Sequence, residues 1–325
     1  MDVKELRIAF PNAAGGLSKA VDGVSFELAE RDTMALVGES GCGKTLSALA
    51  LLRLTPVDAR VNAERLAVAG HDILVSDDRA LATLRGGVVG LVLQEPAQAL
   101  NPVRTVGSQV AEAARLHLKV TGKQALRIAA DLLAEVGVNP PGAMLAAYPH
   151  QLSGGQRQRA LLASALSGQP RLVIADEPTS ALDTMTARRL IAVLARLHAK
   201  RGVALMIISH DLPLVAPSVA WVTVLYAGET VEIARREDLF AAPAHPYTTA
   251  LVDMMPQGNR RRGSPLPTIA GQVARPGAWS TGCRFAARCP MAFSRCREAR
   301  PALVPTERGR WVRCFLYSSA EHTDA

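Results

Sequence analysis

A glycine-rich segment near the N-terminus, GESGCGKT at residues 38–45, has the residue types and the spacing needed to bind phosphate groups. Its glycines let the backbone wrap closely, so that N–H groups can point at phosphate oxygens. Lys44 supplies a positive charge for the β- and γ-phosphates, and the Thr45 hydroxyl can ligate Mg²⁺. The pattern G-x-x-x-x-G-K-[ST] therefore indicates a nucleotide-binding P-loop made by Gly38, Glu39, Ser40, Gly41, Cys42, Gly43, Lys44 and Thr45.

Four other polar side chains stand at the ends of short apolar segments. Asp176 and Glu177 close the segment RLVIADEP, and α/β sheets bind ligands at the carboxyl ends of their strands. One carboxylate can hold Mg²⁺, and the other can orient or deprotonate an attacking water. His210, near the end of residues 203–211, is a candidate γ-phosphate contact. Gln94, at the end of residues 88–94, is a candidate sensor of Mg²⁺ or water.

A second candidate phosphate site lies in the segment LSGGQ. Its Gly-Gly pair lets another group approach the backbone closely, and its serine hydroxyl stands where a helix is predicted to begin, near residue 156. The residues are Ser153, Gly154, Gly155 and Gln156. A chain with two separate phosphate-type sites could pair head to tail with a second chain, so that each chain completes the other's ATP site.

The elements that must position these residues alternate between strand and helix. Apolar segments at residues 33–37, 88–94, 171–178 and 203–211 predict buried strands, and residues 46–54 and 184–200 predict helices. Residues 1–32 and 221–234 are typical of antiparallel strands. From residue 95 to about 168 the pattern is helical, and the apolar residues at 125–136 repeat at amphipathic helix spacing. The order predicts an α/β fold with a parallel sheet covered on both faces.

Charge and cysteines divide the chain near its C-terminal quarter. The 325 residues carry a net charge of +8, but residues 1–255 hold 25 Lys+Arg against 25 Asp+Glu. Residues 256–325 hold 12 Arg against 4 acids and therefore carry the whole excess. No apolar run approaches the ~18 residues that span a bilayer. The N-terminal residues have no signal-peptide pattern, and we expect the chain to stay in the cytoplasm.

Four of the five cysteines lie in this basic tail, at Cys283, Cys289, Cys296 and Cys314. Clustered thiols in a cytoplasmic protein suggest a metal site before disulfides. The spacing lacks the short knuckles of structural zinc sites and modestly favours a larger iron–sulfur cluster, with zinc and four free cysteines as alternatives. Arginines among these cysteines, namely Arg284, Arg288, Arg295, Arg297 and Arg313, are interpreted as offsetting the cluster's negative charge. The run at residues 260–262 could face anionic headgroups, a partner chain or only solvent.

These motifs together resemble the ATP-binding subunits of ABC transporters. GESGCGKT looks like the family's Walker A motif, RLVIADE like Walker B and LSGGQ like the signature, and Gln94, Asp183 and His210 are similar to its Q-loop, D-loop and H-loop residues. The resemblance covers residues 1–235, with a helical subdomain at about 95–168. It implies a P-loop NTPase fold with a parallel core sheet and antiparallel β and helical subdomains, Mg²⁺ bound through Thr45, Gln94 and Asp176, and catalysis by Glu177. Phe10 is the implied adenine-stacking aromatic.

The rest of the chain, residues 236–325, resembles the small cysteine-rich C-terminal extension of dipeptide, oligopeptide and nickel importers. HPYTTALVDMMP and GCRFAARCPMAFSRC carry this similarity, which implies a [4Fe–4S] cluster on the four tail cysteines. The implied function is ATP hydrolysis, with Mg²⁺, that powers peptide uptake across the cytoplasmic membrane from its cytoplasmic face. The implied partners are a second, related ATPase, two transmembrane permeases and an external solute-binding protein.

Two other functions remain open at this point. One is import of nickel or another small solute by the same machinery, because the ATPase does not contact cargo. The other is a non-transport ABC ATPase that acts on nucleic acid, suggested by the sequence pI of about 9.6 but not expected for a charge-neutral ATPase region. Cys42 stands where this subgroup usually has serine; its place beside Lys44 suggests a reactive thiolate whose alkylation would block ATP binding, against the alternative of a merely small residue.

Overall fold

The structure is a computed structural model and describes the chain except for residues 14, 181, 256–267, 275, 277–278 and 319–325. The arginine run at residues 260–262 lies outside the described residues. Among the described residues, no helix is long and apolar enough to cross a membrane.

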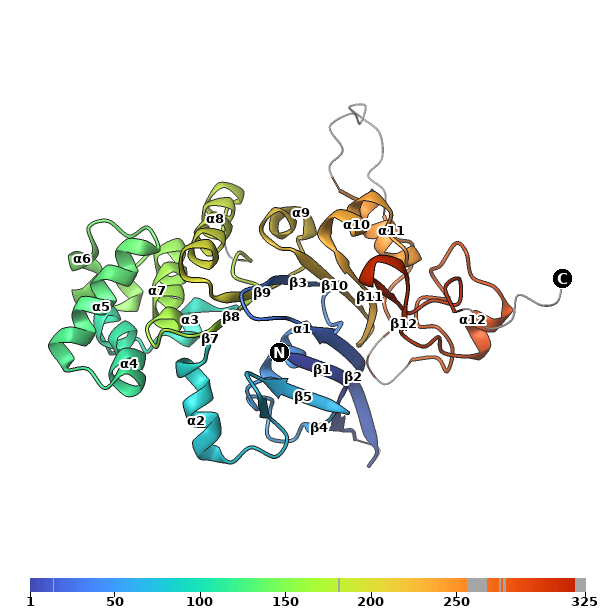
Figure 1. The fold of residues 1–325 in the computed structure, drawn as a ribbon, viewed down its shortest axis with the longest axis horizontal. Helices are drawn as coiled ribbons and strands as arrows, with labels where there is room; N and C mark the ends of the chain where they lie inside the picture. Colours follow the sequence, from blue (N-terminus) through green and yellow to red (C-terminus); the bar gives the residue numbers. More distant parts are fainter. Residues whose placement is uncertain (14, 181, 256–267, 275, 277–278, 319–325) are drawn as a thin grey trace.

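A mixed sheet of eight strands, in the order β12-β13-β11-β10-β3-β9-β8-β7, forms the centre of the described structure (Figure 1). The five strands from β10 to β7 run parallel, and β11, β13 and β12 add antiparallel pairs at one edge. The strands are β3 (Thr33–Val37), β7 (Val89–Val92), β8 (Leu172–Asp176), β9 (Ala204–Ser209), β10 (Trp221–Tyr226), β11 (Glu229–Arg235), β12 (Val304–Pro305) and β13 (Trp311–Val312).

Both faces of this sheet are buried, as its continuous apolar strands predict. Side chains alternate between the two faces, so Met34 and Leu36 of β3 join one hydrophobic cluster while Ala35 and Val37 join the other. One face is covered by α1 and by a second, antiparallel sheet. Its strands are β1 (Asp2–Pro11), β2 (Leu17–Glu27), β4 (Arg60–Asn62), β5 (Arg65–Val68) and β6 (His71–Asp72).

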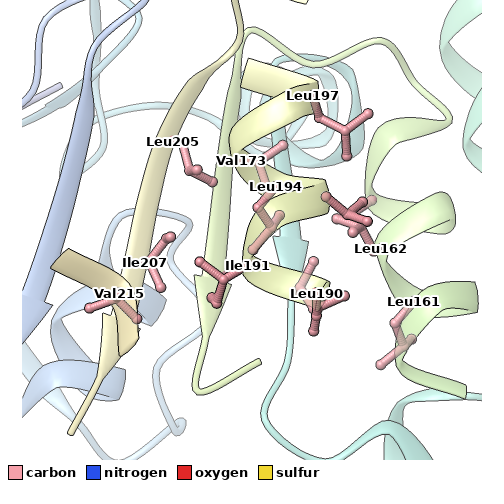
Figure 2. Packing of buried hydrophobic residues seen from close by; sticks show 14 of the residues in the cluster. Leu161, Leu162, Val173, Leu190, Ile191, Leu194, Leu197, Leu205, Ile207 and Val215 are labelled. Atoms are coloured by element: carbon pink, nitrogen blue, oxygen red, sulfur yellow. The ribbon is translucent and has the colours of Figure 1, made fainter. Parts of the chain in front are cut away.

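Helices cover the other face and form a separate layer at one end of the molecule (Figure 1). Figure 2 shows leucines of α7 and α8 packed over β8 and β9, which fixes both helices on the sheet. The α-helices are α1 (Lys44–Ala50), α2 (Asp78–Gly87), α3 (Pro96–Ala99), α4 (Val106–Leu118), α5 (Gly122–Glu135), α6 (Pro141–Ala146), α7 (Gly154–Leu166), α8 (Thr184–Arg201), α9 (Leu212–Val215), α10 (Arg236–Ala241), α11 (Pro246–Asp253) and α12 (Ser294–Glu298). Three short 3-10 turns are η1 (Pro149–Gln151), η2 (Ala216–Ser218) and η3 (Glu307–Gly309).

The predicted α/β fold, with its antiparallel and helical parts, is confirmed. The helix after the P-loop is shorter than predicted, because α1 ends at Ala50 and Arg53 adopts a left-handed conformation with φ of 50°. Leu51 and Leu52 are buried and continue the apolar pattern of α1 into the turn that follows it. Periodicity alone therefore predicted that the helix continues through them.

The C-terminal extension is joined to the core sheet rather than set apart from it. β13 pairs with β11, and β12 pairs with β13, so the last strands of the chain extend the sheet that carries the P-loop. Two-residue strands carry little sequence signal, and this pairing was not predicted. The boundary placed at residue 235 stays a prediction about domains.

Buried arginines of the extension pair with carboxylates of the preceding part of the chain. Arg284 lies 2.6 Å from Asp22 and 3.7 Å from Glu229, and its guanidinium stacks over the Trp279 ring at 3.7 Å. Arg313 donates to backbone carbonyls and lies 3.2 Å from a carboxylate oxygen of Glu5. Burial opposes ionisation of Asp22, but its arginine neighbours outweigh that cost and hold its pKa below the usual value.

The interpretation of these arginines as counter-charges for a metal cluster is therefore wrong for Arg284, Arg288 and Arg313, which face carboxylates outside the extension. Arg295 lies over the ring of Phe315. Charged side chains that leave water need a partner of opposite charge, and in this chain the basic extension meets acids of the first 235 residues.

Candidate nucleotide site

The P-loop connects β3 to α1, and its glycines occupy positions that other residues could not. Gly38 has φ of 153°, and a Cβ there would meet the Leu225 carbonyl oxygen at 2.2 Å. Gly43 has φ of 96° and lies against Val21, so a Cβ would approach that side chain at 2.8 Å. These two glycines let the loop pass between neighbouring strands and present its backbone at the start of α1.

Lys44 is buried and folds back over its own loop. Its ammonium donates to the carbonyl oxygens of Gly38 at 2.8 Å and Glu39 at 3.2 Å. A buried ammonium with two carbonyl partners is held where it can exchange those contacts for phosphate oxygens. Ser40 and Gly41 are exposed at the tip of the loop.

Thr45 and Asp176 meet at the predicted Mg²⁺ position. The Thr45 hydroxyl donates to Asp176 Oδ1 at 3.1 Å, although 131 residues separate them in the sequence. Burial raises the pKa of Asp176, and the neighbouring charge of Glu177 adds to the rise. A divalent cation at this point would favour the ionised carboxylate, so the hydroxyl and the carboxylate form a chemically suitable pair for Mg²⁺.

Glu177 and His210 form the second polar pair of the site. His210 Nδ1 lies 2.8 Å from Glu177 Oε2, and the histidine side chain is 57% exposed while that of Glu177 is 9% exposed. Glu177 follows the end of β8 with φ of 45°, and its N–H donates to the Ile208 carbonyl of β9. The strand ends thus direct Asp176 toward the P-loop and Glu177 toward His210, which gives the two carboxylates separate partners.

The hypothesis of a reactive thiolate at Cys42 is wrong. Cys42 is 1% exposed and belongs to the hydrophobic cluster between the central sheet and the antiparallel sheet. Burial raises the pKa of its thiol despite the Lys44 ammonium, whose nitrogen lies 3.9 Å from the sulfur. The sequence argument considered the neighbouring charge and omitted desolvation, which is the larger effect here. Cys42 is a small residue that fills the space under the loop.

In the part of the chain that the structure describes, the hydrogen bonds of this centre do not include Gln94 or Phe10. Gln94 is exposed after the end of β7, and among the described residues no hydrogen bond links it to Thr45 or Asp176. Phe10 pairs with Ser18 near the end of β1 and is half-buried against the cluster under the sheet. Their roles toward Mg²⁺ and adenine stay predictions.

The signature residues begin α7, on a different part of the sheet from the P-loop. Ser153 caps α7 by accepting from the Gln156 N–H at 3.3 Å, and the Gln156 side chain accepts from the Ser153 N–H at 2.8 Å. Gly154 has open space where a side chain would stand, and Gly155 lies near Thr186 at the start of α8. Asp183 caps α8 through the N–H groups of Met185 and Thr186.

Strand order separates the signature from the chain's own P-loop. α7 packs on β7, and two strands lie between β7 and the strand β3 that enters the P-loop. Among the described residues, no hydrogen bond joins Ser153 to Lys44 or Thr45. Ser153 and Gly154 are exposed at the start of this helix.

Two residues of the extension contact the P-loop, and sequence reasoning missed both. Arg288 Nη1 donates to the Glu39 carboxylate at 3.1 and 3.0 Å, and the Glu39 N–H donates to the Tyr247 hydroxyl at 3.1 Å. Burial disfavours the charge on Arg288, but hydrogen bonds to Glu39 and Tyr226 raise its pKa above the usual value. The excess of arginines in the tail was the signal in the sequence that could have indicated ion pairs with acids of the preceding residues.

The four tail cysteines line a single small cavity together with His245, Phe285 and Phe315. All four are free thiols, and burial raises the pKa of Cys283 to about 11. Among the described residues, however, no three side chains of His, Cys, Asp or Glu lie together as ligands of one metal ion. The predicted metal-cluster site of a cysteine-rich domain is thus not confirmed, although the cysteines share one cavity.

Comparison with solved structures supports the fold. The chain is similar to the dimeric ATP-binding cassette MJ0796 bound to ADP and phosphate, with a TM-score of 0.63 and 23% sequence identity. That match covers 72% of this chain and 98% of the other. A cbiO1 structure from Clostridium perfringens matches with a TM-score of 0.57, 22% identity, and coverage of 74% of this chain and 92% of the other.

Family and sequence comparisons extend over both parts of the chain. The ABC transporter family matches residues 21–180, and the C-terminal region of oligopeptide/dipeptide transporters matches residues 231–296. A probable peptide ABC transporter ATP-binding protein of Sinorhizobium fredii is 40% identical over 97% of this chain and 94% of its own length. A dipeptide transport ATP-binding protein of Escherichia coli is 38% identical over 97% and 95%. The chain belongs to the ABC transporter ATP-binding proteins that carry the oligopeptide/dipeptide transporter C-terminal region.

Proposed function

We propose that this ABC ATPase powers the import of dipeptides or oligopeptides. One observation carries the proposal: the similarity to ATP-binding proteins of peptide transporters extends through the C-terminal region, whose strands join the ATPase sheet and whose side chains contact its P-loop. The cargo class is thus inferred from the C-terminal region, which contacts the nucleotide site. It is not inferred from the ATPase motifs, which all such transporters share.

Hydrolysis follows from the two polar pairs of the site. Lys44 and the P-loop N–H groups would bind the phosphates, and Thr45 and Asp176 would hold Mg²⁺, with Gln94 as the further predicted ligand. Mg²⁺ supplies charge neutralisation along the phosphates when bound. Glu177 orients and deprotonates the attacking water, and His210 holds the Glu177 carboxylate in place at 2.8 Å. Phe10 stacks on adenine.

The site is completed by a second ATPase subunit. Ser153, Gly154 and Gly155 lie at a helix N-terminus, where Ser153 and Gly154 are exposed, and we infer that they contact the γ-phosphate held by the partner. Asp183, exposed at the start of α8, stands beside this surface. The partner is a related ATPase chain, and ATP acts as part of the contact between the two subunits.

The remaining partners are two transmembrane permeases and an external solute-binding protein. The ATPase would lie at the cytoplasmic face of the membrane, held there by the permeases, and would make no contact with cargo. ATP binding closes the ATPase pair and changes which side of the membrane the permease pathway faces, and hydrolysis resets it. Import of nickel or another small solute is the alternative for the same machinery.

A nucleic-acid function has little support from the charge distribution. Among the described residues, five arginines of the extension form ion pairs with carboxylates of the first 235 residues: Arg284, Arg288, Arg300, Arg310 and Arg313. These pairs consume much of the positive charge that would otherwise contact phosphates.

The cargo proposal is tested by ATP hydrolysis in the assembled transporter. The purified complex in nanodiscs is given its binding protein loaded with a mixture of di- to pentapeptides, or with Ni²⁺, or empty. We expect the peptide-loaded protein to raise the ATPase rate severalfold over the empty protein. Stimulation by Ni²⁺ alone, or by DNA or RNA with no permease present, would replace the peptide assignment by the corresponding alternative.

We propose that the cysteine cavity holds an iron–sulfur cluster, with zinc as the alternative. Cys283, Cys289, Cys296 and Cys314 offer four thiolate ligands around one cavity walled by aromatic rings. Such a cluster would supply a rigid cross-link between the segments that carry these cysteines.

Anaerobic purification should therefore yield a brown protein that contains about four iron and four sulfide per chain. Cys289→Ala should lose most of that colour, while Cys42→Ala, which changes a cysteine outside the cavity, should keep it. A colourless wild-type protein with stoichiometric zinc would replace the cluster by zinc, and a metal-free protein would leave four structural thiols.

A further inference from the structure

Glu39 places a carboxylate in the loop that must receive a polyanionic nucleotide. It follows Gly38 directly, and its backbone carbonyl is one of the two oxygens that hold the Lys44 ammonium. An uncompensated negative charge so close to the bound phosphates would weaken nucleotide binding by about tenfold or more. The P-loop therefore needs a cation for Glu39 that does not compete with Lys44 for phosphate.

Arg288 meets this need from the other end of the chain. Its Nη1 lies within hydrogen-bond distance of both Glu39 carboxylate oxygens, at 3.1 and 3.0 Å, across 249 residues of sequence. The side chains of Arg288 and Glu39 are 7% and 28% exposed, so the pair is only partly screened by water and salt. The same guanidinium donates to the Tyr226 hydroxyl and to the carbonyl oxygens of Ile269 and Ala270. These partners fix its position independently of Glu39.

A second contact holds the backbone of the same residue. The Glu39 N–H donates to the hydroxyl of Tyr247, which is fully buried. The Tyr247 ring packs against Tyr226 at 4.7 Å and Phe285 at 5.5 Å between ring centroids, and Phe285 is part of the segment that carries Arg288. The Glu39 N–H thus already has a protein partner, and Tyr247 holds the backbone of the loop at this residue.

We propose that Arg288, supported by Tyr247, is a positioning residue of the nucleotide site: it neutralises Glu39 and turns that carboxylate away from the incoming phosphates, so that the C-terminal extension sets the ATP affinity of the P-loop. Arg288 does not touch ATP. The proposal concerns nucleotide binding and stands whether the cargo is peptide or another solute.

A double-mutant cycle in the purified transporter tests this role. Arg288→Ala should weaken binding of a fluorescent ATP analogue about tenfold, and Arg288→Lys, which keeps the charge, should weaken it less than threefold. In a Glu39→Gln background, where no charge needs neutralising, Arg288→Ala should change the dissociation constant less than twofold. Arg308→Ala, which removes an exposed arginine of the same extension paired with Asp238, is the matched control.

A purely structural role would give a different result. Loss of packing would lower ATP affinity equally in the wild-type and the Glu39→Gln backgrounds, and it would lower the melting temperature in proportion. An equal loss of affinity in both backgrounds overturns the proposal, and so does unchanged affinity of the Arg288→Ala transporter. Recovery confined to the Glu39→Gln background supports it.

Discussion

Replacing Glu177 with glutamine should lower the ATP turnover of the assembled transporter about 10³-fold while ATP remains bound. Glutamine keeps the shape of the side chain and its contact with His210, but it cannot accept a proton from the attacking water. The 2.8 Å distance between His210 and the carboxylate indicates that the side chain is already held in one orientation, so the loss falls on chemistry rather than on position. Phosphate release and nucleotide affinity, measured on the same preparation, distinguish a loss of the chemical step from a loss of ATP binding.

Glu112→Gln is the control for this experiment, since Glu112 is an exposed acid of α4 paired with Arg104. It should hydrolyse ATP at the wild-type rate. Turnover within tenfold of wild type by the Glu177→Gln transporter would remove Glu177 from the role of general base and leave His210 as the residue to test next.

Arg284→Ala should lower the free energy of unfolding by about 3 kcal/mol, at the low end of the cost of breaking a buried ion pair. The side chains of Arg284, Asp22 and Glu229 are 4%, 7% and 2% exposed, so the carboxylates cannot turn to water when the arginine is removed. Arg300, 2.6 Å from Glu229 and 3.5 Å from Asp22, remains and limits the loss. Thermal melting of the purified chain, followed by fluorescence, measures the change.

This loss should depend on pH in a defined direction. The pKa of Asp22 is held below its usual 3.8, so its contribution to stability is complete at neutral pH and disappears as the pH falls through the folded-state pKa. The wild type and Arg284→Ala should therefore converge in acid. Arg308→Ala, whose ion pair is exposed, should melt within about 2 °C of wild type; an equal drop for both variants would contradict a buried network at Arg284.

The nucleotide-binding strands and loops could be predicted because their signals are local. A P-loop needs glycines at fixed spacing, a buried parallel strand needs a continuous apolar run, and a capped helix start needs a serine followed by glutamine three residues on; each signal lies within about ten residues. Strand–helix alternation then predicted the parallel sheet. Thr45 and Asp176 could be placed together because strand ends of one sheet edge converge.

The role of the C-terminal extension could not be predicted in this way. Its contacts with the core join Arg288 to Glu39, Arg313 to Glu5 and β13 to β11, pairs far apart in sequence whose partners are fixed only by the folded surface. The unequal charge of the two parts was visible in the sequence. The arginines were interpreted as offsetting the charge of a metal cluster, whereas several of them pair with carboxylates of the ATPase region. The prediction of a reactive thiolate at Cys42 failed for a related reason. The burial of Cys42 depends on strands that lie far from it in the sequence.

The most direct measurement for the whole account is uptake of labelled dipeptide or oligopeptide by proteoliposomes that contain the assembled transporter, with ATP on the side of the ATPase subunits and the binding protein on the other. We predict peptide accumulation that requires hydrolysable ATP and is abolished by Glu177→Gln. Peptide accumulation that continues at the wild-type rate with the Glu177→Gln subunit, or ATP hydrolysis that never moves peptide, would contradict the central claim that ATP hydrolysis at this site drives peptide import.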